Sequence, residues 1–407
     1  MFKKFRSITG DSQSTKYLAA EHLPFANKDL PSQKLFYISN FARIPFHVLV
    51  LLCVFVLFGL MNMYSISLTK GTMYFKKFAV FWLLSTVILF IVPIINLRYF
   101  LKFSYLIYIA AVLSLFGVFV IGDVSMGARR WIDFGFMKIQ PSEFAKIAVV
   151  FALARYYHFI KSFTMHNLLN AGIALIIAII PAGLTMIQPD LGSGLVIIFI
   201  TLLVIFVNGI RWHWLIIAFV GFCALTPVVW GKLHDYQKDR ILTFINPERD
   251  PRGAGYNVIQ SKIAIGSGGI FGKGYTQNDQ SSLQFLPENQ TDFAFTVFAE
   301  EFGFVGSVML ILCFVYLIIY GNVVAQKCKN YFGKMLAFGV TSLLFVHICV
   351  NLMMIMGVLP VVGIPLPFIS YGGSSLMLCV FCVALLINID IHRNITIHST
   401  VRTYMLK

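Results

Sequence analysis

The chain has 407 residues, of which 58% are hydrophobic and only 12% are charged, and its mean hydropathy is +0.81. Soluble domains of ordinary composition carry about 25% charged residues, so this composition excludes them and indicates an integral membrane protein. The formal net charge is +15, and the positions of the basic residues therefore help to orient the chain in the bilayer.

The first part of the chain differs from the rest because it is polar and basic. It contains no short apolar stretch followed by a small-residue cleavage site, so we expect no cleaved signal peptide. Residues 1–45 are expected to form a basic cytoplasmic tail.

Apolar segments close to the roughly 20 residues that a membrane span needs follow this tail. Backbone groups in hydrocarbon must be hydrogen-bonded internally, so these segments are predicted to be helices. The predicted fold class is all-α, a polytopic integral membrane protein with about ten transmembrane helices in residues 46–390. The predicted spans are 46–66, 74–95, 103–121, 143–160, 168–187, 191–208, 213–231, 292–320, 333–357 and 367–389.

Basic residues in the short loops orient these spans, because cytoplasmic loops are enriched in lysine and arginine. They place both termini, including the tail 391–407, in the cytoplasm. The basic residues that support this orientation are Arg98, Lys102, Arg155, Lys161, Arg211, Lys327, Lys329 and Lys334. The exceptions are Arg129, Arg130 and Lys138, which fall on the opposite, outer side. Two interpretations are open for them: they bind an anionic ligand, or they pair with nearby acids such as Asp133.

The outer loop before the fourth span combines charged and aromatic residues. Pro141 suits a first helical turn, and Glu143 and Lys146 lie three residues apart on one helical face. They form a local salt bridge, or they contact substrate or a metal. Trp131 is either an interface aromatic or a flat surface for a sugar ring or lipid.

Two further outer segments are rich in turn-forming residues. Asp190, in the short turn 188–194, is expected to cap the sixth span rather than to act in catalysis. Residues 363–375 contain prolines, glycines and Ser370. Irregular backbone of this kind at membrane depth predicts a pocket wall or a simple helix break.

The connection 232–290 is the longest outer loop, and loops longer than about 15 residues in compact proteins are usually functional or disordered. Its glycine-rich stretch 263–274 and its apolar run 283–287 argue against disorder. We expect the segment to fold onto the helices or to lie in the membrane interface.

Asp292 lies where this loop enters the eighth span. A carboxylate at such a boundary can have the raised pKa that a general base needs, or it can simply cap the helix. Glu300 and Glu301 follow on the same predicted helix. They are either ion-coupling groups of a transporter or acids satisfied by a neighbouring helix, and the second interpretation is favoured.

Several motifs make the sequence resemble the SEDS family (shape, elongation, division and sporulation) of bacterial peptidoglycan glycosyltransferases. They are GARRWIDFG, QPSEFAK, QPDLGSG, NPERDPRGAGYNVIQSKIAIGSGGIFGKG, FLPENQTDF and PFISYGGSS. The resemblance covers residues 46–390 and implies a SEDS fold with a large periplasmic loop at 232–290. The run from Asn246 to Asp292 is more similar to the elongation branch, RodA, than to the division branch, FtsW.

The resemblance implies that the chain polymerises lipid II into β-1,4 glycan strands on the outer face of the bacterial cytoplasmic (inner) membrane. It implies a class B penicillin-binding transpeptidase and the elongation machinery as partners, and no nucleic acid. Asp292 takes the position of the family's essential aspartate. Substrate contacts are expected at Trp131, Arg130, Lys138, Glu143, Lys146, Asp190, Arg240 and Ser370.

An inverting transfer needs one base and a stabiliser of the leaving pyrophosphate. Asp292 is the predicted base, and the outer cations are the predicted stabilisers. No organic cofactor is expected, whereas a divalent cation, Mg²⁺ or Mn²⁺, is a candidate helper with Glu143 as a ligand. The alternative function is a lipid II flippase, for which decisive polar groups near the bilayer midplane are expected.

Overall fold

The computed structural model describes residues 43–125, 128–133, 135, 138–160, 168–210, 235–250, 253–277 and 290–395, with isolated positions between 213 and 231. Contacts divide the chain into Met1–Arg43 and Ile44–Lys407. The helices and strands described below all belong to the second unit. The predicted cytoplasmic tail, residues 1–45, lies almost entirely outside the described residues.

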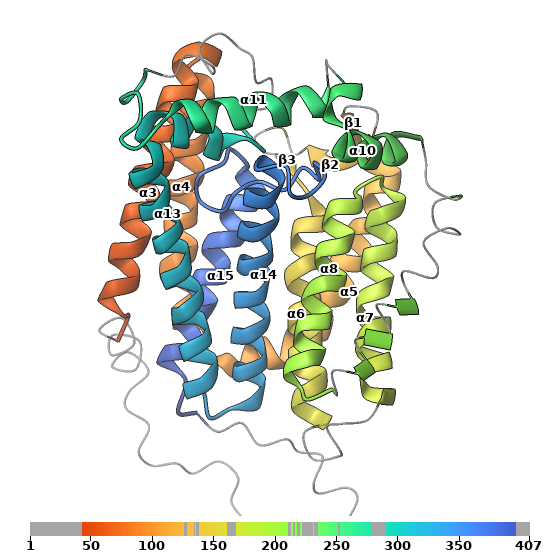
Figure 1. Cartoon of the computed structure of the whole chain (residues 1–407). Coiled ribbons are helices and arrows are strands. Elements are labelled where there is room, and N and C mark those ends of the chain that lie inside the picture. Colours follow the sequence, from red (N-terminus) through yellow and green to blue (C-terminus); the bar gives the residue numbers. More distant parts are fainter. Residues whose placement is uncertain are drawn as a thin grey trace, which may run out of the picture. The chain divides into compact units, whose positions relative to one another are not determined.

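Long apolar helices run back and forth to form a bundle (Figure 1). They are α3 (Phe46–Lys70), α4 (Met73–Ile91, extended by the 3-10 turn η1, Val92–Ile94), α5 (Leu97–Ile121), α6 (Pro141–Ile160), α7 (Leu168–Ile187), α8 (Leu191–Val207), α13 (Ala294–Lys327), α14 (Tyr331–Ile355) and α15 (Gly373–Ile391). Within the described residues, seven helices are long and apolar enough to cross a membrane. The predicted all-α, multi-pass membrane architecture is therefore confirmed.

Two spans fall outside that set of seven for clear reasons. Helix α8 is shorter, and α6 carries Glu143, Lys146 and Arg155. Arg155 Nη1 donates to the carbonyl oxygens of Leu101 and Lys102, which ties α6 to α5. The predicted seventh span, 213–231, lies mostly outside the described residues, so the total of ten spans stays a prediction.

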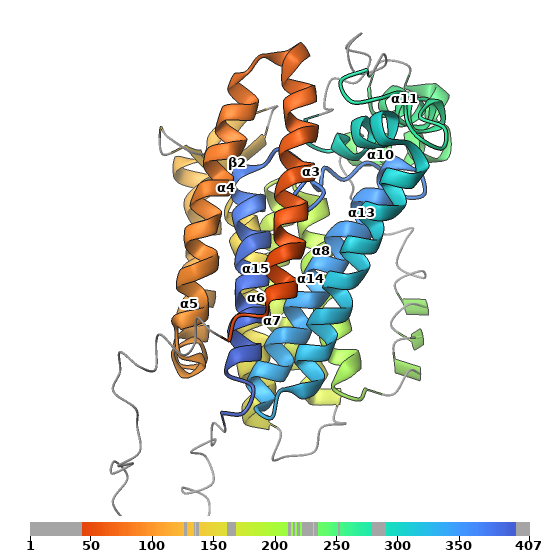
Figure 2. The same cartoon turned by 90° about the vertical axis from the view of Figure 1, so that its left-hand side faces the viewer.

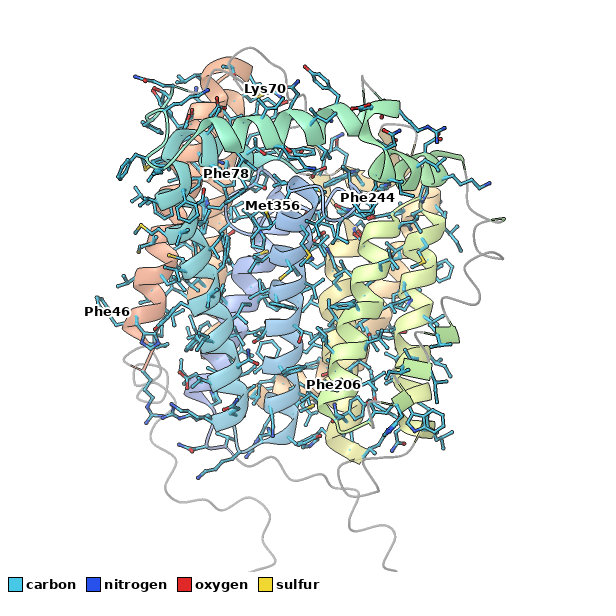
Figure 3. All side chains as sticks on the ribbon, in the orientation of Figure 1. Phe46, Lys70, Phe78, Phe206, Phe244 and Met356 are labelled. Atoms are coloured by element: carbon cyan, nitrogen blue, oxygen red, sulfur yellow. The ribbon has the colours of Figure 1, made fainter. Side chains whose placement is uncertain are left out.

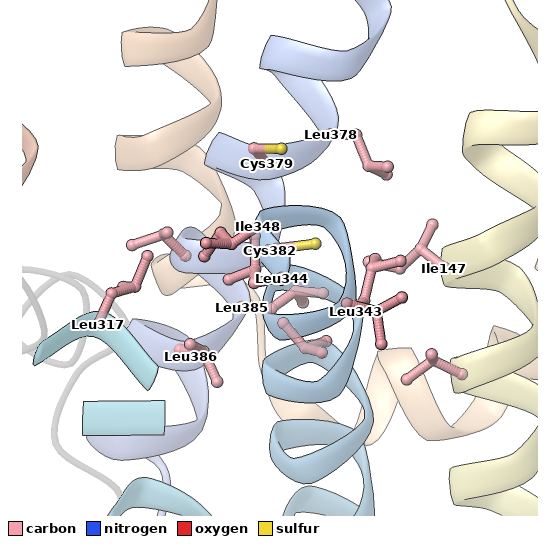
Figure 4. Close-up of a cluster of buried hydrophobic side chains, with 14 of the residues drawn as sticks. Ile147, Leu317, Leu343, Leu344, Ile348, Leu378, Cys379, Cys382, Leu385 and Leu386 are labelled. Atoms are coloured by element: carbon pink, nitrogen blue, oxygen red, sulfur yellow. The ribbon is translucent and has the colours of Figure 1, made fainter. Parts of the chain in front are cut away.

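Helices α14 and α15 form the centre of the bundle, and most of each is buried by its neighbours. Helix α14 packs against α6, α8, α13 and α15. Figure 4 shows aliphatic side chains of α14 and α15 interlocking, among them Leu343, Leu344 and Leu385. Since lipid tails are as apolar as these side chains, close van der Waals packing stabilises the contact.

One end of the bundle carries the non-membrane elements, and we call it the α11 end. Lys70 and Met356 lie toward this end, whereas Phe46 and Phe206 lie toward the other (Figure 3). Its elements are β1 (Asp123–Ser125), β2 (Ala128–Asp133), β3 (Lys138–Ile139), α10 (Asp235–Ile245), η2 (Pro247–Arg249) and α11 (Ala254–Ser267). The strands form an antiparallel sheet in the order β1-β2-β3, which the sequence analysis did not predict.

Helix α11 packs on α13 and α14, and in both views it lies over the end of α13 (Figures 1 and 2). The loop 232–290 therefore folds onto the helices over its described part, as predicted. Beyond α11, residues 268–274 form what we call the glycine loop.

The glycine loop enters a break in α13 at Gly303, whose φ of 65° and ψ of −159° are not helical. Lys273 N donates to the carbonyl of Glu300 at 3.0 Å, and Phe304 N donates to the carbonyl of Gly269 at 2.9 Å. The loop thus supplies partners for backbone groups that the break removes from the helical ladder.

The predicted start of the last span at residue 367 is wrong, because α15 begins at Gly373. Two prolines, Pro365 and Pro367, precede a left-handed residue, Phe368, with a φ of 67°. Proline removes an amide donor and restricts its predecessor, so this run cannot continue a helix.

Gly303→Ala is expected to destabilise the protein by at least about 1–3 kcal/mol, because its backbone conformation is essentially restricted to glycine. A Cβ there would also overlap the amide nitrogen of Gly272. Thermal unfolding in detergent would measure the loss. Gly117→Ala in α5 is the matched control, since no atom lies within 4 Å of its Cβ position. Equal melting temperatures for the two variants would contradict the role of the break.

Candidate active site at the α11 end

Asp292 lies in the turn of residues 290–293 that leads into α13, and it is half-buried. The N-cap residue of α13 is Phe293, so Asp292 precedes the N-cap position instead of occupying it. The Asp292 carboxylate lies beside the loop before α15, since a Cβ on Gly363 would come 3.5 Å from Oδ2.

Three contacts attach the Asp292 turn to its surroundings. Tyr371 N donates to the carbonyl of Gln290 at 2.8 Å, and Lys70 Nζ donates to the side-chain oxygen of Gln290. Asn351 Nδ2 donates to the carbonyl oxygen of Asp292 at 2.9 Å. The sequence analysis missed Asn351, for which the only available signal was a polar residue in an apolar span.

The loop between α14 and α15 is irregular, and residues 366–370 within it are buried, so both the pocket wall and the helix break stay predictions. The hydroxyl oxygen of Ser370 accepts a hydrogen bond from Leu366 N at 2.9 Å. The ring of Phe368 stacks on that of Phe55, with centroids 4.8 Å apart. Ser370 is buried and closes the turn next to Asp292, so the structure gives it a local structural contact.

Glu143 and Lys146 form a buried ion pair on α6, with Nζ 2.6 Å from Oε1. Lys146 Nζ also lies 3.0 Å from Nε2 of His347 on α14. Glu143 Oε2 and His347 Nδ1 are buried and have no hydrogen-bond partner among the described residues. The pair confirms the local salt-bridge interpretation.

Asp190 joins two helix starts. Its Oδ1 accepts from Ser193 N at 3.1 Å and caps α8, as predicted. Its Oδ2 accepts from Gln140 Nε2 at 3.0 Å and Ser142 Oγ at 3.3 Å, at the start of α6. Asp190 thus fixes the starts of α6 and α8 relative to each other.

Arg130 and Lys138, the cations predicted to lie on the outer side, have protein partners. Arg130 of β2 donates to the carbonyl oxygens of Gln188 and Pro189 in the turn between α7 and α8. Lys138 Nζ lies 3.4 Å from Oδ2 of Asp133, and the two side chains are 55% and 33% exposed. The pKa of Asp133 is lowered, first by a hydrogen bond from the backbone N–H of Gly135 and then by the hydrogen bond and positive charge of Lys138.

The two remaining predicted substrate contacts are Trp131 and Arg240. Trp131 lies on β2 opposite Asp123 and is half-buried. Arg240 belongs to α10, and its side chain lies outside the described part. The structure therefore brings the sheet, the turn between α7 and α8 and the start of α6 together through Arg130 and Asp190.

The acids of α13 are held by neighbouring segments: Glu301 by a helix, as the favoured interpretation predicted, and Glu300 by a loop. Glu300 Oε1 accepts from Lys273 Nζ of the glycine loop at 2.8 Å. Glu301 Oε1 accepts from the hydroxyl of Ser65 on α3. These contacts join the break in α13 to two other segments at the same end.

A metal site is not indicated by the side chains that the structure describes, which contain no group of three or more His, Cys, Asp or Glu suited to a metal. Glu143, the candidate ligand, faces the ammonium of Lys146 instead. A divalent cation on Glu143 therefore stays a prediction.

Comparisons with known proteins show which family this chain matches. A family model described as "Cell cycle protein", covering FtsW, RodA and SpoVE, matches residues 41–395. The chain is 43% identical over 288 residues to peptidoglycan glycosyltransferase MrdB of Escherichia coli (strain K12), covering 70% of this chain and 77% of the relative. It is 34% identical over 347 residues to a probable peptidoglycan glycosyltransferase FtsW of Geobacter metallireducens, covering 82% and 91%.

Solved structures agree with this match. A peptidoglycan synthase complex that coordinates polymerization and crosslinking contains a chain with a TM-score of 0.75 at 28% identity, covering 86% of this chain and 98% of that one. The crystal structure of the rod shape determining protein RodA of Thermus thermophilus has a TM-score of 0.66 at 26% identity, covering 86% and 98%.

Lys146→Met is expected to destabilise the protein by about 3–5 kcal/mol, because it leaves the Glu143 carboxylate buried without its cation. The double variant Glu143→Leu/Lys146→Met should recover most of that loss, since it removes both charges. Thermal unfolding in detergent compares the two. Lys138→Met, in the exposed pair, should cost no more than about 1 kcal/mol. A double variant no more stable than Lys146→Met would argue against the ion pair as the cause.

Proposed function

Since the chain belongs to the FtsW, RodA and SpoVE family, we propose that it is a peptidoglycan glycosyltransferase of the elongation type. Its substrate is lipid II, and its product is the β-1,4 glycan strand of the cell wall. The observation that carries this proposal is Asp292, a half-buried residue just before α13 whose carboxylate lies beside the irregular loop before α15.

The orientation of the protein follows from the basic loops. The α11 end faces outward from the bacterial cytoplasmic (inner) membrane, and both termini are cytoplasmic. Both substrates carry lipid tails and arrive within the membrane, so they reach Asp292 sideways between the ends of α6, α13 and α15. This route explains why a glycosyltransferase is built from membrane spans.

Asp292 acts as the general base. Its carboxylate takes the proton from the 4-hydroxyl of the acceptor N-acetylglucosamine, and the resulting oxygen nucleophile forms a bond to the donor's anomeric carbon. The bond from that carbon to the undecaprenyl pyrophosphate breaks in the same displacement. The anomeric centre is inverted, so no covalent sugar–enzyme intermediate is needed.

The leaving pyrophosphate needs positive charge. Lys138 is the best placed of the candidates with described side chains, because it is exposed and its pair with Asp133 is of a weak kind that a pyrophosphate can replace. Arg130 and Lys146 are bound to protein groups and act mainly by shaping the site. Arg240 of α10 is a further candidate, and Trp131 offers a surface for a sugar ring.

A class B penicillin-binding transpeptidase is the proposed partner. The synthase complex whose chain resembles this one couples polymerization to crosslinking, which supports a pairing of that kind. Glu143, the candidate metal ligand, is paired with Lys146, and the proposed displacement uses side chains of the protein.

Asp292→Asn is expected to reduce glycan polymerisation by about 10²- to 10⁴-fold, the usual contribution of a general base. The measurement uses purified full-length protein with lipid II and a partner transpeptidase, and reads glycan chain length on a gel.

Asp390→Asn is the matched control for this experiment. Asp390 lies at the other end of α15, where it pairs with Arg393, so this variant should polymerise like the wild type. Polymer from Asp292→Asn at the wild-type rate would refute the assignment of the base. Lipid II crossing vesicle membranes without any polymer from the wild type would favour the flippase.

A further inference from the structure

Two buried asparagines on different helices bind the main chain of the Asp292 turn and of the α13 residue that follows it. Asn351 Nδ2, on α14, donates to the carbonyl oxygen of Asp292 at 2.9 Å and to that of Ile364 at 2.7 Å. Asn62 Nδ2, on α3, donates to the carbonyl oxygen of Ala294 at 3.1 Å. Both asparagine side chains are fully buried.

These bonds do more than satisfy carbonyl groups, because they join separate segments. Asn351 links the turn that carries Asp292 to the loop that carries Gly363, and the Asp292 carboxylate lies beside Gly363. Asn62 of α3 fixes the position of Ala294, the first residue of α13. Asn351 and Asn62 therefore hold the chain by its carbonyl oxygens on both sides of Phe293, the N-cap residue of α13.

We propose that Asn351, assisted by Asn62, is a positioning residue that holds the Asp292 carboxylate at its working distance from the loop before α15. This inference rests on the proposed function, because it assigns a geometric cause to the activity of the base. Neither asparagine touches substrate. Each acts by fixing a carbonyl oxygen within two residues of the reacting carboxylate.

The same bundle contains an asparagine with matching bonds at its other end. Asn388 Nδ2, on α15, donates to the carbonyl oxygens of Val92 at 2.8 Å and Ile95 at 2.6 Å, and this side chain is also fully buried. For both Asn351 and Asn388, Oδ1 has no hydrogen-bond partner within the described chain. A substitution of Asn388 is therefore a control, because it also removes a buried side chain that bridges two carbonyl oxygens, but far from Asp292.

The experiment compares Asn351→Leu with Asn388→Leu, since leucine removes both donors at similar volume. Both variants should melt at lower temperature than the wild type. Only Asn351→Leu should lose kcat, by about 10²-fold, because a displacement of about 1 Å can cost that much. Its KM for lipid II should stay within about twofold, as expected when an interaction of the transition state alone is lost.

Equal kcat values per folded enzyme for the two leucine variants would overturn the proposal. Asp292→Asn, measured in the same series, separates it from the proposed function. A fully active Asp292→Asn refutes the base itself, whereas an inactive Asp292→Asn beside an unimpaired Asn351→Leu refutes only the positioning role.

If Asn351→Leu does not accumulate, Asn351→Ser replaces it, because serine is smaller and cannot overpack the site. Its single hydroxyl cannot replace two amide donors that bridge separate segments. The proposal then requires a lower kcat for Asn351→Ser than for Asn388→Leu, and equal values would overturn it.

Discussion

Every peptide N–H and C=O inside a bilayer must find its partner within the protein. Most of this chain meets that condition with helices, but the candidate site needs irregular backbone in the Asp292 turn, the break in α13 and the loop before α15. Side chains and loops therefore supply partners: Asn351 for the carbonyl oxygen of Asp292, and the glycine loop for the break. The geometry of the candidate site thus depends on hydrogen bonds between segments.

The candidate polar residues separate into two groups when their contacts are compared. Asp190 and Arg130 are bound to protein groups and fix how the sheet, α6 and the turn between α7 and α8 meet. The Glu143–Lys146 pair lies within α6 and faces His347 of α14. Asp292 and Lys138 remain accessible to a ligand, since the first is half-buried and the second is exposed. A polar motif in a membrane protein can therefore be as necessary for architecture as for chemistry.

Hydropathy predicted the long helices that the structure describes, because the bilayer imposes their length and composition. It misplaced the start of α15, where the apolar residues around Pro365 and Pro367 read like a span although their backbone cannot be helical. The short strands β1–β3 were missed because such strands have too few residues for a periodic pattern. Asn351 and Asn62 were missed because a lone asparagine says nothing about which carbonyl oxygen it will meet.

The break at Gly303 also divides α13 into a short part and a long part. After it, α13 continues to Lys327 for about 24 residues, or roughly 36 Å at 1.5 Å per residue, which alone exceeds the roughly 30 Å of hydrocarbon. The long part is therefore sufficient to cross a membrane by itself. The part from Ala294 to Gly303, with Glu300 and Glu301, is not needed to complete that span, so it is available to carry the candidate site at the α11 end.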